Sequence, residues 1–285
     1  MKKMDINEFD YNLPENLIAQ TPIKERDHSK LLIVNRKDGN YKDEVFYNII
    51  NYLHKGDVLV LNNTKVLPSR IIGYKTDTNA KIEVLLLTDL GNNVWECLVR
   101  PQKRVHIGTV IKFDDDFTCE VVEVKDNGIT HVKLMFSGIL VEHLDKVGAM
   151  PLPPYIHEKL KDNSCYNTVY AKREGSAAAP TAGLHFTKEI LDALKAKGVT
   201  ICYITLHVGL GTFRPVSVTD VTKHKMHSEF YHISQEVADI LNNAKKSGKR
   251  IVSVGTTSTR TLETVMTKYN TFKKCFGNTD IFIYP

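Results

Sequence analysis

The sequence lacks the features that mark membrane and secreted proteins. In its 285 residues no apolar run approaches the ~20 residues of a membrane-spanning helix, and the opening MKKMDINEFDYN has no signal-peptide core. Its five cysteines are scattered, odd in number and free of any C-x-x-C pair. This pattern argues for a reducing compartment and against a disulfide framework or a cysteine zinc site. We therefore expect a soluble, cytoplasmic protein without membrane association.

The sequence also lacks both common glycine-rich phosphate loops, so a nucleoside triphosphate substrate is not expected. No internal repeat or low-complexity segment is present. The hydrophobic content of 42% and charged content of 25% are ordinary for a globular protein. A chain of this length can bury a large core and is somewhat long for one average domain, which favours two domains.

The net charge of +5 is unevenly distributed. Residues 151–285 hold 18 of the 38 Lys and Arg but only 11 of the 33 Asp and Glu, so the positive excess lies in this block. A basic block favours contact with a polyanion, although a solvated lysine-rich surface would give the same count.

Short β-rich runs dominate the middle of the chain. Segments 70–74, 80–88, 94–99, 109–113, 118–124 and 130–136 are separated by turn-prone Asn, Asp and Gly clusters. Regular short spacing with this turn chemistry predicts an antiparallel barrel or sandwich. Proline-rich joints at Val66–Pro68 and Gly148–Pro154 bracket these runs, so we predict an inserted β-barrel domain at 65–150.

Helices and strands alternate after Tyr155. Thr187 and Ser234 are predicted helix N-caps, and strands are predicted at 199–208, 250–254 and 279–284. The fold class expected is α/β: a mixed, largely parallel sheet domain with an inserted antiparallel β-barrel domain. The α/β catalytic domain would be discontinuous, formed by 1–64 and 151–285. The last predicted strand would leave an apolar edge at Ile281–Ile283.

Two stretches with small residues and a histidine each indicate a binding site. GSAAAPTAGLHF covers Gly175–Phe186, and LHVGLGTFRPV covers Leu206–Val216. Small side chains let a flat ligand approach the backbone, whereas a tight turn with core histidines is the plain alternative. His185 and His207 have the intrinsic pKa to act as acid or base near neutrality.

The segment GTTSTR, Gly255–Arg260, lies where a predicted strand ends and a helix begins. Free backbone N–H groups and the positive end of the helix dipole converge there, and the hydroxyls add donors. A carboxylate is therefore a reasonable ligand for this segment.

His224, His227 and His232, together with Glu229, suggest a metal site. Their spacing matches no common zinc signature, however, and the segment resembles a loop that leads into a strand. No metal is predicted, and a metal-dependent hydrolase is kept as an alternative.

Five segments carry a family resemblance: 62–70 (NNTKVLPSR), 150–156 (MPLPPYI), the two small-residue stretches, and 255–263 (GTTSTRTLE). With these motifs the chain resembles, from near Phe9 to Pro285, the S-adenosylmethionine:tRNA ribosyltransferase-isomerases of queuosine synthesis. Lys65 stands where many relatives have Arg, which keeps the charge but loses the planar fork. Family members continue past the final IFIYP through an Asn-Phe-His-Leu-Pro motif, so we expect the present form to keep its fold but turn over poorly.

The resemblance implies the reaction and the partners. The ribosyl group of S-adenosylmethionine would be transferred and isomerised onto 7-aminomethyl-7-deazaguanine at the tRNA wobble position, giving epoxyqueuosine-tRNA, adenine and methionine. Partners would be S-adenosylmethionine as co-substrate, with no other cofactor, and the tRNA anticodon stem-loop; a monomer is expected. A noncatalytic tRNA-binding protein remains an alternative.

Three sets of residues are predicted for this site. Catalysis is assigned to His185, His207 and Glu229, without deciding which is acid and which base. S-adenosylmethionine would be bound by Gly175, Ser176, Ala177, Pro180, Thr181, Gly183, Gly209, Gly211, Thr212, Phe213, Thr256, Thr257, Ser258 and Arg260. tRNA would be bound by Lys65, Arg70, Arg100, Lys103, Arg104 and Arg214, in which the basic turn RPQKR is either a phosphate clamp or a charged hairpin tip.

Overall fold

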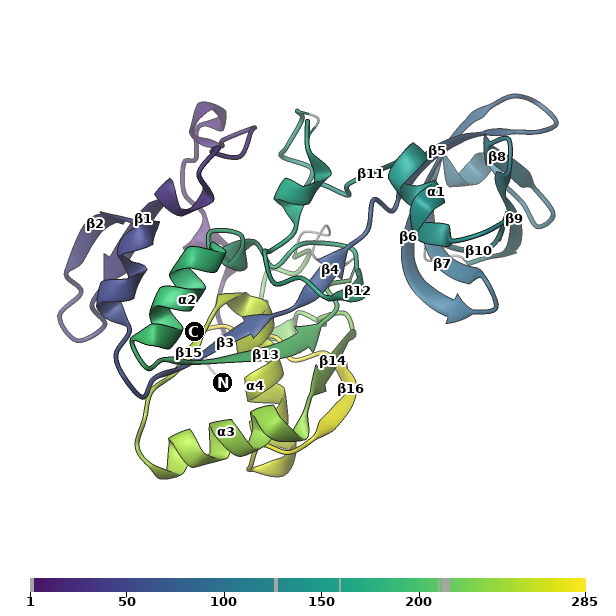
Figure 1. Cartoon of the computed structure of the whole chain (residues 1–285). Coiled ribbons are helices and arrows are strands. Elements are labelled where there is room, and N and C mark those ends of the chain that lie inside the picture. Colours follow the sequence, from purple (N-terminus) through teal and green to yellow (C-terminus); the bar gives the residue numbers. More distant parts are fainter. Residues whose placement is uncertain (1–2, 126–127, 159, 210, 212–215) are drawn as a thin grey trace.

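A five-stranded sheet forms the centre of the larger part of the molecule (Figure 1). The computed structural model describes residues 3–125, 128–158, 160–209, 211 and 216–285. The strands, in spatial order, are β15 (Ile251–Ser253), β3 (Val58–Asn62), β13 (Thr200–Leu206), β14 (Glu229–Ile233) and β16 (Cys275–Thr279). β15, β3 and β13 are mutually parallel, whereas β14 and β16 are added antiparallel. The mixed sheet agrees with the predicted α/β class.

Helices cover both faces of this sheet because its central strand is apolar on both sides. Every residue of β3 is buried. Val58 and Val60 face α3 (Gln235–Lys246) and α4 (Gly255–Tyr269), whereas Leu59 and Leu61 face α2 (Lys188–Ala196) and the 3-10 helix η4 (Phe46–Tyr52). A strand buried on both faces reads as a continuous apolar run, as VLVLN does.

The two predicted N-caps are confirmed. The hydroxyl oxygen of Thr187 accepts from the backbone N–H of Ile190 at 3.2 Å, and that of Ser234 accepts from the N–H of Val237 at 3.3 Å. Each bond satisfies one of the N–H groups that a helix start leaves without an intrahelical partner.

The middle of the chain forms a closed antiparallel barrel. Its strands, in spatial order, are β5 (Arg70–Lys75), β6 (Lys81–Gly91), β7 (Val94–Arg100), β10 (Ile129–Phe136), β9 (Phe117–Val124) and β8 (Val110–Asp114). β5 closes the barrel on β8 through the pairs Tyr74↔Lys112 and Lys75↔Ile111. Closure removes the free sheet edges, and alternate residues fill the interior. The predicted antiparallel barrel is confirmed. Its strands lie within residues 65–150, and these domain bounds stay a prediction.

Two elements differ from the prediction. Helix α1 (Leu140–Val147) follows the barrel strands, so the segment is not all-β; its Leu144 is fully buried in the barrel core. The last strand, β16, ends at Thr279 rather than beginning there, because Cys275 and Thr279 are its buried residues. The apolar run Ile281–Ile283 that suggested a strand instead lines a cavity.

The connections between the two parts lie close together. The short strand β4 (Thr64–Val66) leads into the barrel and pairs with β12 (Arg173–Ser176), while β11 (Gly148–Ala149) leads out and pairs with β5. Ala177, next to β12, packs with Leu85, Leu87 and Ile129 of the barrel. The barrel therefore sits to one side of the main body, beside the first small-residue stretch (Figure 1).

The remaining elements are a hairpin and short 3-10 helices. The hairpin is β1 (Lys30–Val34) with β2 (Tyr41–Val45). The 3-10 helices are η1 (Ile6–Phe9), η2 (Glu15–Leu17), η3 (Arg26–His28), η5 (Gln102–Arg104), η6 (Asn163–Tyr166), η7 (Thr181–Gly183) and η9 (Val221–Lys223). Of the helices in the described part of the chain, none has the length and apolar character that a membrane span requires.

Candidate active site

A cavity of about 780 Å³ lies at the carboxyl ends of β13 and β15. Its walls include four segments that are distant in sequence: residues 178–182, the start of α4, the segment from His224 to Glu229, and residues 281–283. Ligands of open α/β sheets bind at this edge because the loops that follow parallel strands meet there. The cavity is large enough for a nucleoside-sized molecule.

The two small-residue stretches are joined, as their shared pattern suggested. The backbone N–H of Ala177 donates to the carbonyl of Val208 at 2.8 Å, and the N–H of Val208 donates to Ser176 Oγ at 2.9 Å. Ser176 Oγ in turn donates to the carbonyl of Ala178 at 2.7 Å. Ser176 and Ala177 thus fasten the two stretches together, and the next residues, Ala178–Ala182, form the cavity wall.

The start of α4 faces the cavity with uncapped N–H groups. Gly255, Thr256 and Thr257 line it, and the N-cap residue, Val254, has no side chain that can cap the helix. The buried Thr257 Oγ1 makes no hydrogen bond to any described group. The first turn of a long helix therefore presents its positive end and free donors to the cavity, which favours an anionic ligand group.

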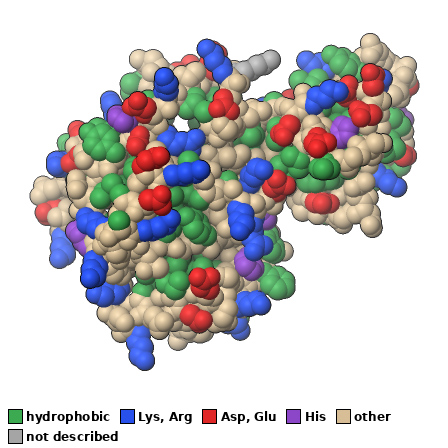
Figure 2. Space-filling model, viewed as in Figure 1, with side chains coloured by type: hydrophobic (Ala, Val, Ile, Leu, Met, Phe, Trp, Pro, Cys, Tyr) green, Lys and Arg blue, Asp and Glu red, His purple; other side chains and the backbone are tan. Residues whose placement is uncertain are grey.

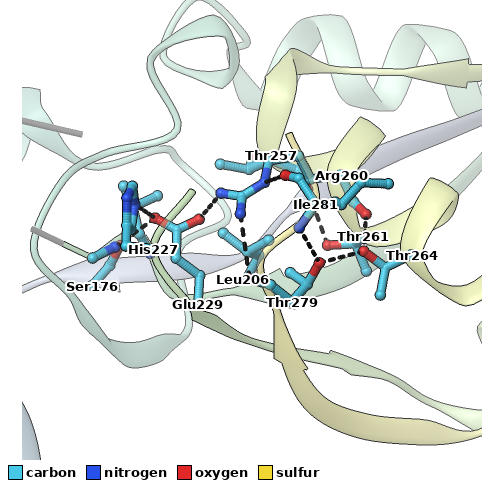
Figure 3. A network of polar contacts seen from close by, with 12 residues as sticks. Ser176, Leu206, His227, Glu229, Thr257, Arg260, Thr261, Thr264, Thr279 and Ile281 are labelled. Carbon is cyan, nitrogen blue, oxygen red and sulfur yellow. Dashed lines mark hydrogen bonds and ion pairs between the residues drawn. The ribbon is translucent and has the colours of Figure 1, made fainter. Parts of the chain in front are cut away.

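Glu229 is a buried carboxylate at the cavity wall, with only 1% of its side chain exposed (Figure 3). Its Oε2 forms an ion pair with Arg260 Nη1. Its Oε1 accepts from the backbone N–H of Gly209 at 2.8 Å and lies 3.0 Å from His227 Nε2. Burial of a charged group is tolerated when it is paired and hydrogen-bonded in this way.

Arg260 links Glu229 to the end of the described chain. Its Nε donates to the carbonyl of Ile281 at 3.1 Å, and its Nη2 donates to the carbonyl of Thr279 at 3.3 Å. Thr279 is held further by a 2.6 Å contact between its Oγ1 and that of Thr264. Arg260 lines the cavity, and three of its N–H groups contact Glu229, Thr279 and Ile281, so it joins Glu229 to the 279–283 segment (Figure 3).

The three histidines of the metal alternative lie in different surroundings. His227 pairs with Glu229, His224 packs edge-on against Phe282 at 4.7 Å between ring centroids, and His232 lies on β14. Within the described residues, no group of three or more His, Cys, Asp or Glu side chains is placed to hold a metal ion. The arrangement gives the hydrolase alternative no support.

His185 and His207, both predicted to be catalytic, do not line this cavity. His185 packs against the ring of Phe46, at 5.3 Å between centroids, on the α2 side of the sheet. His207 Nδ1 lies 2.8 Å from Thr64 Oγ1. Burial, and then the nearby charge of Arg173, lower the pKa of His207. Of the predicted catalytic residues, Glu229 alone borders the cavity.

The predicted S-adenosylmethionine-binding residues divide in the same way. Those that line the cavity are Pro180, Thr181, Gly211, Thr256, Thr257 and Arg260. Those that do not line it are Gly175, Ser176, Ala177, Gly183, Gly209 and Ser258. Thr212 and Phe213, like the tRNA-binding candidate Arg214, lie outside the described residues.

Several lining residues were not predicted from the sequence. They include Tyr155, Tyr166, Met226 and the 281–283 segment. Tyr155 directly follows the predicted proline-rich joint, Gly148–Pro154. The 281–283 segment was misread as a strand because its apolar residues suit either role.

Four predicted tRNA-binding residues lie on the barrel. Arg70 and Arg100 line a second cavity of about 420 Å³ with Glu83 and Gln102, and Arg100 and Arg104 border a neighbouring hollow. Lys103 is exposed on η5 in the same turn. Lys65 lies elsewhere, on β4, paired with Glu174 at 3.0 Å.

Comparisons with known proteins agree with this arrangement of motifs. A family model described as "Queuosine biosynthesis protein" matches residues 6–285. The chain is 56% identical over 283 residues to S-adenosylmethionine:tRNA ribosyltransferase-isomerase of Staphylococcus haemolyticus (strain JCSC1435), and 58% identical to the protein of that name from Macrococcus caseolyticus (strain JCSC5402). Each match covers 99% of this chain and 83% of the relative.

A solved structure is similar as well. It is the S-adenosylmethionine tRNA ribosyltransferase of Thermotoga maritima, with 35% identity, a TM-score of 0.48, and coverage of 98% of this chain and 79% of that one. The family model and the curated relatives match nearly the whole chain, and they confirm the resemblance predicted from the sequence motifs. The chain belongs to the queuosine biosynthesis protein family.

Proposed function

We propose that the chain is an S-adenosylmethionine:tRNA ribosyltransferase-isomerase. It transfers and isomerises the ribosyl moiety of S-adenosylmethionine onto 7-aminomethyl-7-deazaguanine at the tRNA wobble position and releases adenine and methionine. The observation that carries this proposal is that an uncapped helix start and a buried carboxylate line the same cavity. The names of the close relatives support the reaction class. Action in the cytoplasm as a monomer stays a prediction.

The cavity offers complementary sites for the parts of S-adenosylmethionine. The methionine carboxylate suits the free N–H groups and the unpaired Thr257 hydroxyl at the start of α4. Adenine suits the apolar and aromatic wall that includes Ala178, Tyr155 and Phe282. The sulfonium centre between them would then lie where Glu229 supplies a carboxylate.

The reaction needs a base beside the sulfonium, whose charge makes the adjacent carbon acidic, and an acid for the departing adenine. Glu229 is the predicted catalytic residue that borders the cavity, and we assign it the proton transfer. A proton accepted at Oε1 can pass to His227 Nε2, 3.0 Å away, when the imidazole carries its proton on Nδ1 and Nε2 is bare. Arg260 and the Gly209 N–H fix the carboxylate so that it needs no reorganisation during the reaction.

The test is an adenine-release assay with purified protein, adenine-labelled S-adenosylmethionine and tRNA that carries the 7-aminomethyl-7-deazaguanine base. Release should require that tRNA, and tRNA with guanine at the wobble position is the substrate control. Glu229→Gln should slow release by about 100-fold or more, the usual contribution of a positioned acid or base. The exposed Glu263→Gln, on the same helix as Arg260, should act as wild type.

Three outcomes would contradict the proposal. Release that is independent of tRNA would indicate a simple nucleosidase, and tRNA binding without release would favour the noncatalytic alternative. Release that a chelator abolishes would favour the metal-dependent hydrolase. Because Glu229→Gln leaves Arg260 without its ion pair, His227→Gln serves as a second variant, and thermal melting with S-adenosylmethionine binding checks that both variants fold.

A further inference from the structure

Four ring side chains lie on one face of the sheet at the β14–β16 edge. Phe230 and His232 alternate on β14 with the buried Glu229 and Tyr231, so they point to the face opposite α3 and α4. Phe276 stands directly opposite His232 in the register of β16, and therefore shares that face.

His207 completes the group at the end of β13. Its backbone N–H donates to the carbonyl of Phe230 at 2.9 Å, and the two rings stack at 5.6 Å between centroids with an interplanar angle of 19°. We call His207, Phe230, His232 and Phe276 the ring face. It includes His207, one of the two predicted catalytic histidines that do not line the cavity.

The two phenylalanines of the ring face are open to solvent, whereas its two histidines are half-buried. Phe276 is 72% exposed and Phe230 is 39% exposed. On this side of the sheet α2 and η4 pack over β3 and β13, and among the described residues no hydrophobic cluster includes the four rings. Aromatic side chains that are open to solvent and close together on a sheet favour a binding surface.

Cations surround these rings. Arg173 is exposed and lies close enough to lower the pKa of both His207 and His232, after burial as the main cause, and Lys274 adds to the effect on His232. Lys65 and Glu174, an ion pair, flank Arg173 on β4 and β12. A lowered pKa favours the neutral form of both histidine rings. Figure 2 shows histidine, hydrophobic and Lys or Arg side chains together over this edge of the main body.

The ring face begins at the rim of the candidate active site. His207 precedes Val208, which lines the cavity, and Phe230 follows Glu229 on the opposite side of the same strand. A chain that lies on the ring face can therefore reach around the sheet edge to the cavity.

We propose that the ring face is a stacking platform for unpaired bases of the RNA substrate, with Arg173, Lys274 and Lys65 against its phosphates. The proposal rests on the proposed function, since it takes the substrate to be a tRNA whose wobble base lies in a single-stranded loop. Neutral rings bordered by cations on a sheet surface are the arrangement by which proteins hold single-stranded RNA, because every base has a face that stacks. In this assignment His207 contacts the RNA rather than the reacting atoms.

The test compares two RNAs of equal length and charge: an anticodon stem-loop and a fully paired duplex. Phe276→Ala and Phe230→Ala should each weaken binding of the stem-loop by about 5-fold to 150-fold, the range for loss of one base–aromatic stack, and leave duplex binding unchanged. Phe276→Tyr, which keeps a ring, should bind as wild type, whereas Phe276→Leu, which keeps only the apolar area, should not. Tyr41→Ala is the control, because Tyr41 is 74% exposed on β2, away from the ring face.

S-adenosylmethionine affinity and the melting temperature of Phe276→Ala should equal those of wild type. An equal loss for stem-loop and duplex would overturn stacking in favour of charge alone. Unchanged RNA binding, with a shift from dimer to monomer in sedimentation, would show instead that the face contacts a second copy. If Phe276→Ala and wild type release adenine at the same rate at limiting tRNA, the proposed stacking platform is wrong and the proposed function stands. If wild type binds neither RNA, both fail.

Discussion

Glu229 illustrates how one buried charge organises this site. A carboxylate with 1% of its side chain exposed is stable only because Arg260, Gly209 and His227 surround it. Removing one partner of such a buried pair typically costs about 3–5 kcal/mol, because the other charge stays desolvated. The contacts whose loss would destabilise the protein also fix the oxygen atoms of Glu229 at the cavity wall.

Gly211 tests whether the position of His227 matters. A methyl group built at Gly211 would lie 1.5 Å from His227 Nδ1, so Gly211→Ala must displace that ring and break its contact with Glu229. We expect adenine release about 100-fold slower, with S-adenosylmethionine affinity little changed. Single-turnover kinetics and calorimetry measure the two quantities.

Gly209→Ala is the matched control for this prediction. The added methyl group would meet Glu229 Cγ at 3.7 Å, an ordinary van der Waals contact. Equal rates for the two variants would show that His227 takes no part in the reaction.

At the residue scale, the sequence predicted which segments meet at the site better than it predicted the role of each residue. The small-residue stretches and GTTSTR were identified as one site because each has a composition that a packed core does not need, and they do meet at the cavity. His185 and His207 were chosen for their chemistry alone. Whether a histidine on a strand end points into a cavity or away from it depends on strand register, which one sequence does not encode locally.

At the scale of elements, the spacing of apolar residues was the main signal from which helices and strands were predicted. Strands with alternating apolar residues and helices with a Thr or Ser cap were placed correctly, because their signals are local. Helix α1 was missed since its eight residues carry no side-chain cap and follow a run of strands. The end of β16 was misplaced because Gly277 and Asn278 interrupt an otherwise strand-like pattern.

The closure of the barrel gives an element-scale prediction. Gly73 lies on β5 where that strand meets β8, and a methyl group there would be 2.6 Å from the carbonyl oxygen of Lys112. Gly73→Ala should therefore lower the free energy of barrel unfolding by about 1–3 kcal/mol, the usual cost of overpacking. Trp95, the single tryptophan, is buried in the barrel core and reports its unfolding by fluorescence in a urea titration.

Ile72→Ala provides the comparison, since Ile72 is 44% exposed on the same strand. If both variants unfold at the same urea concentration, the β5–β8 contact does not determine barrel stability.

At the scale of the whole molecule, the barrel places basic side chains beside the cavity-bearing part. Ala177 joins the first small-residue stretch to Leu85 and Leu87, so the cavity wall and the barrel share a boundary. This relation could not be predicted from the sequence, because it depends on how two separately patterned segments dock. The motif resemblance indicated only that both belong to one enzyme.

The basic turn of the barrel gives a prediction at this scale. If Arg100, Lys103 and Arg104 contact RNA phosphates, replacing all three with Ala should weaken tRNA binding for every sequence. The slope of log affinity against log salt should fall by about 0.7–0.9 for each phosphate that is no longer neutralised. S-adenosylmethionine binding should not change.

A charge-matched control is the triple Ala variant of Lys245, Lys246 and Lys249. These lysines are exposed at the end of α3, far from the barrel in Figure 1. An unchanged slope for the barrel variant would make RPQKR an ordinary charged turn.

The anchoring of the 279–283 segment has a consequence for how such a cavity can diversify. Arg260 holds this wall through the carbonyl oxygens of Thr279 and Ile281, atoms that every amino acid possesses. The side chains of Ile281 and Ile283, which shape the cavity, take no part in these bonds to Arg260, and Phe282 adds a ring contact with His224. Mutation can therefore alter the contour of the wall without detaching it, so this short stretch is where directed evolution toward altered S-adenosylmethionine analogues should begin.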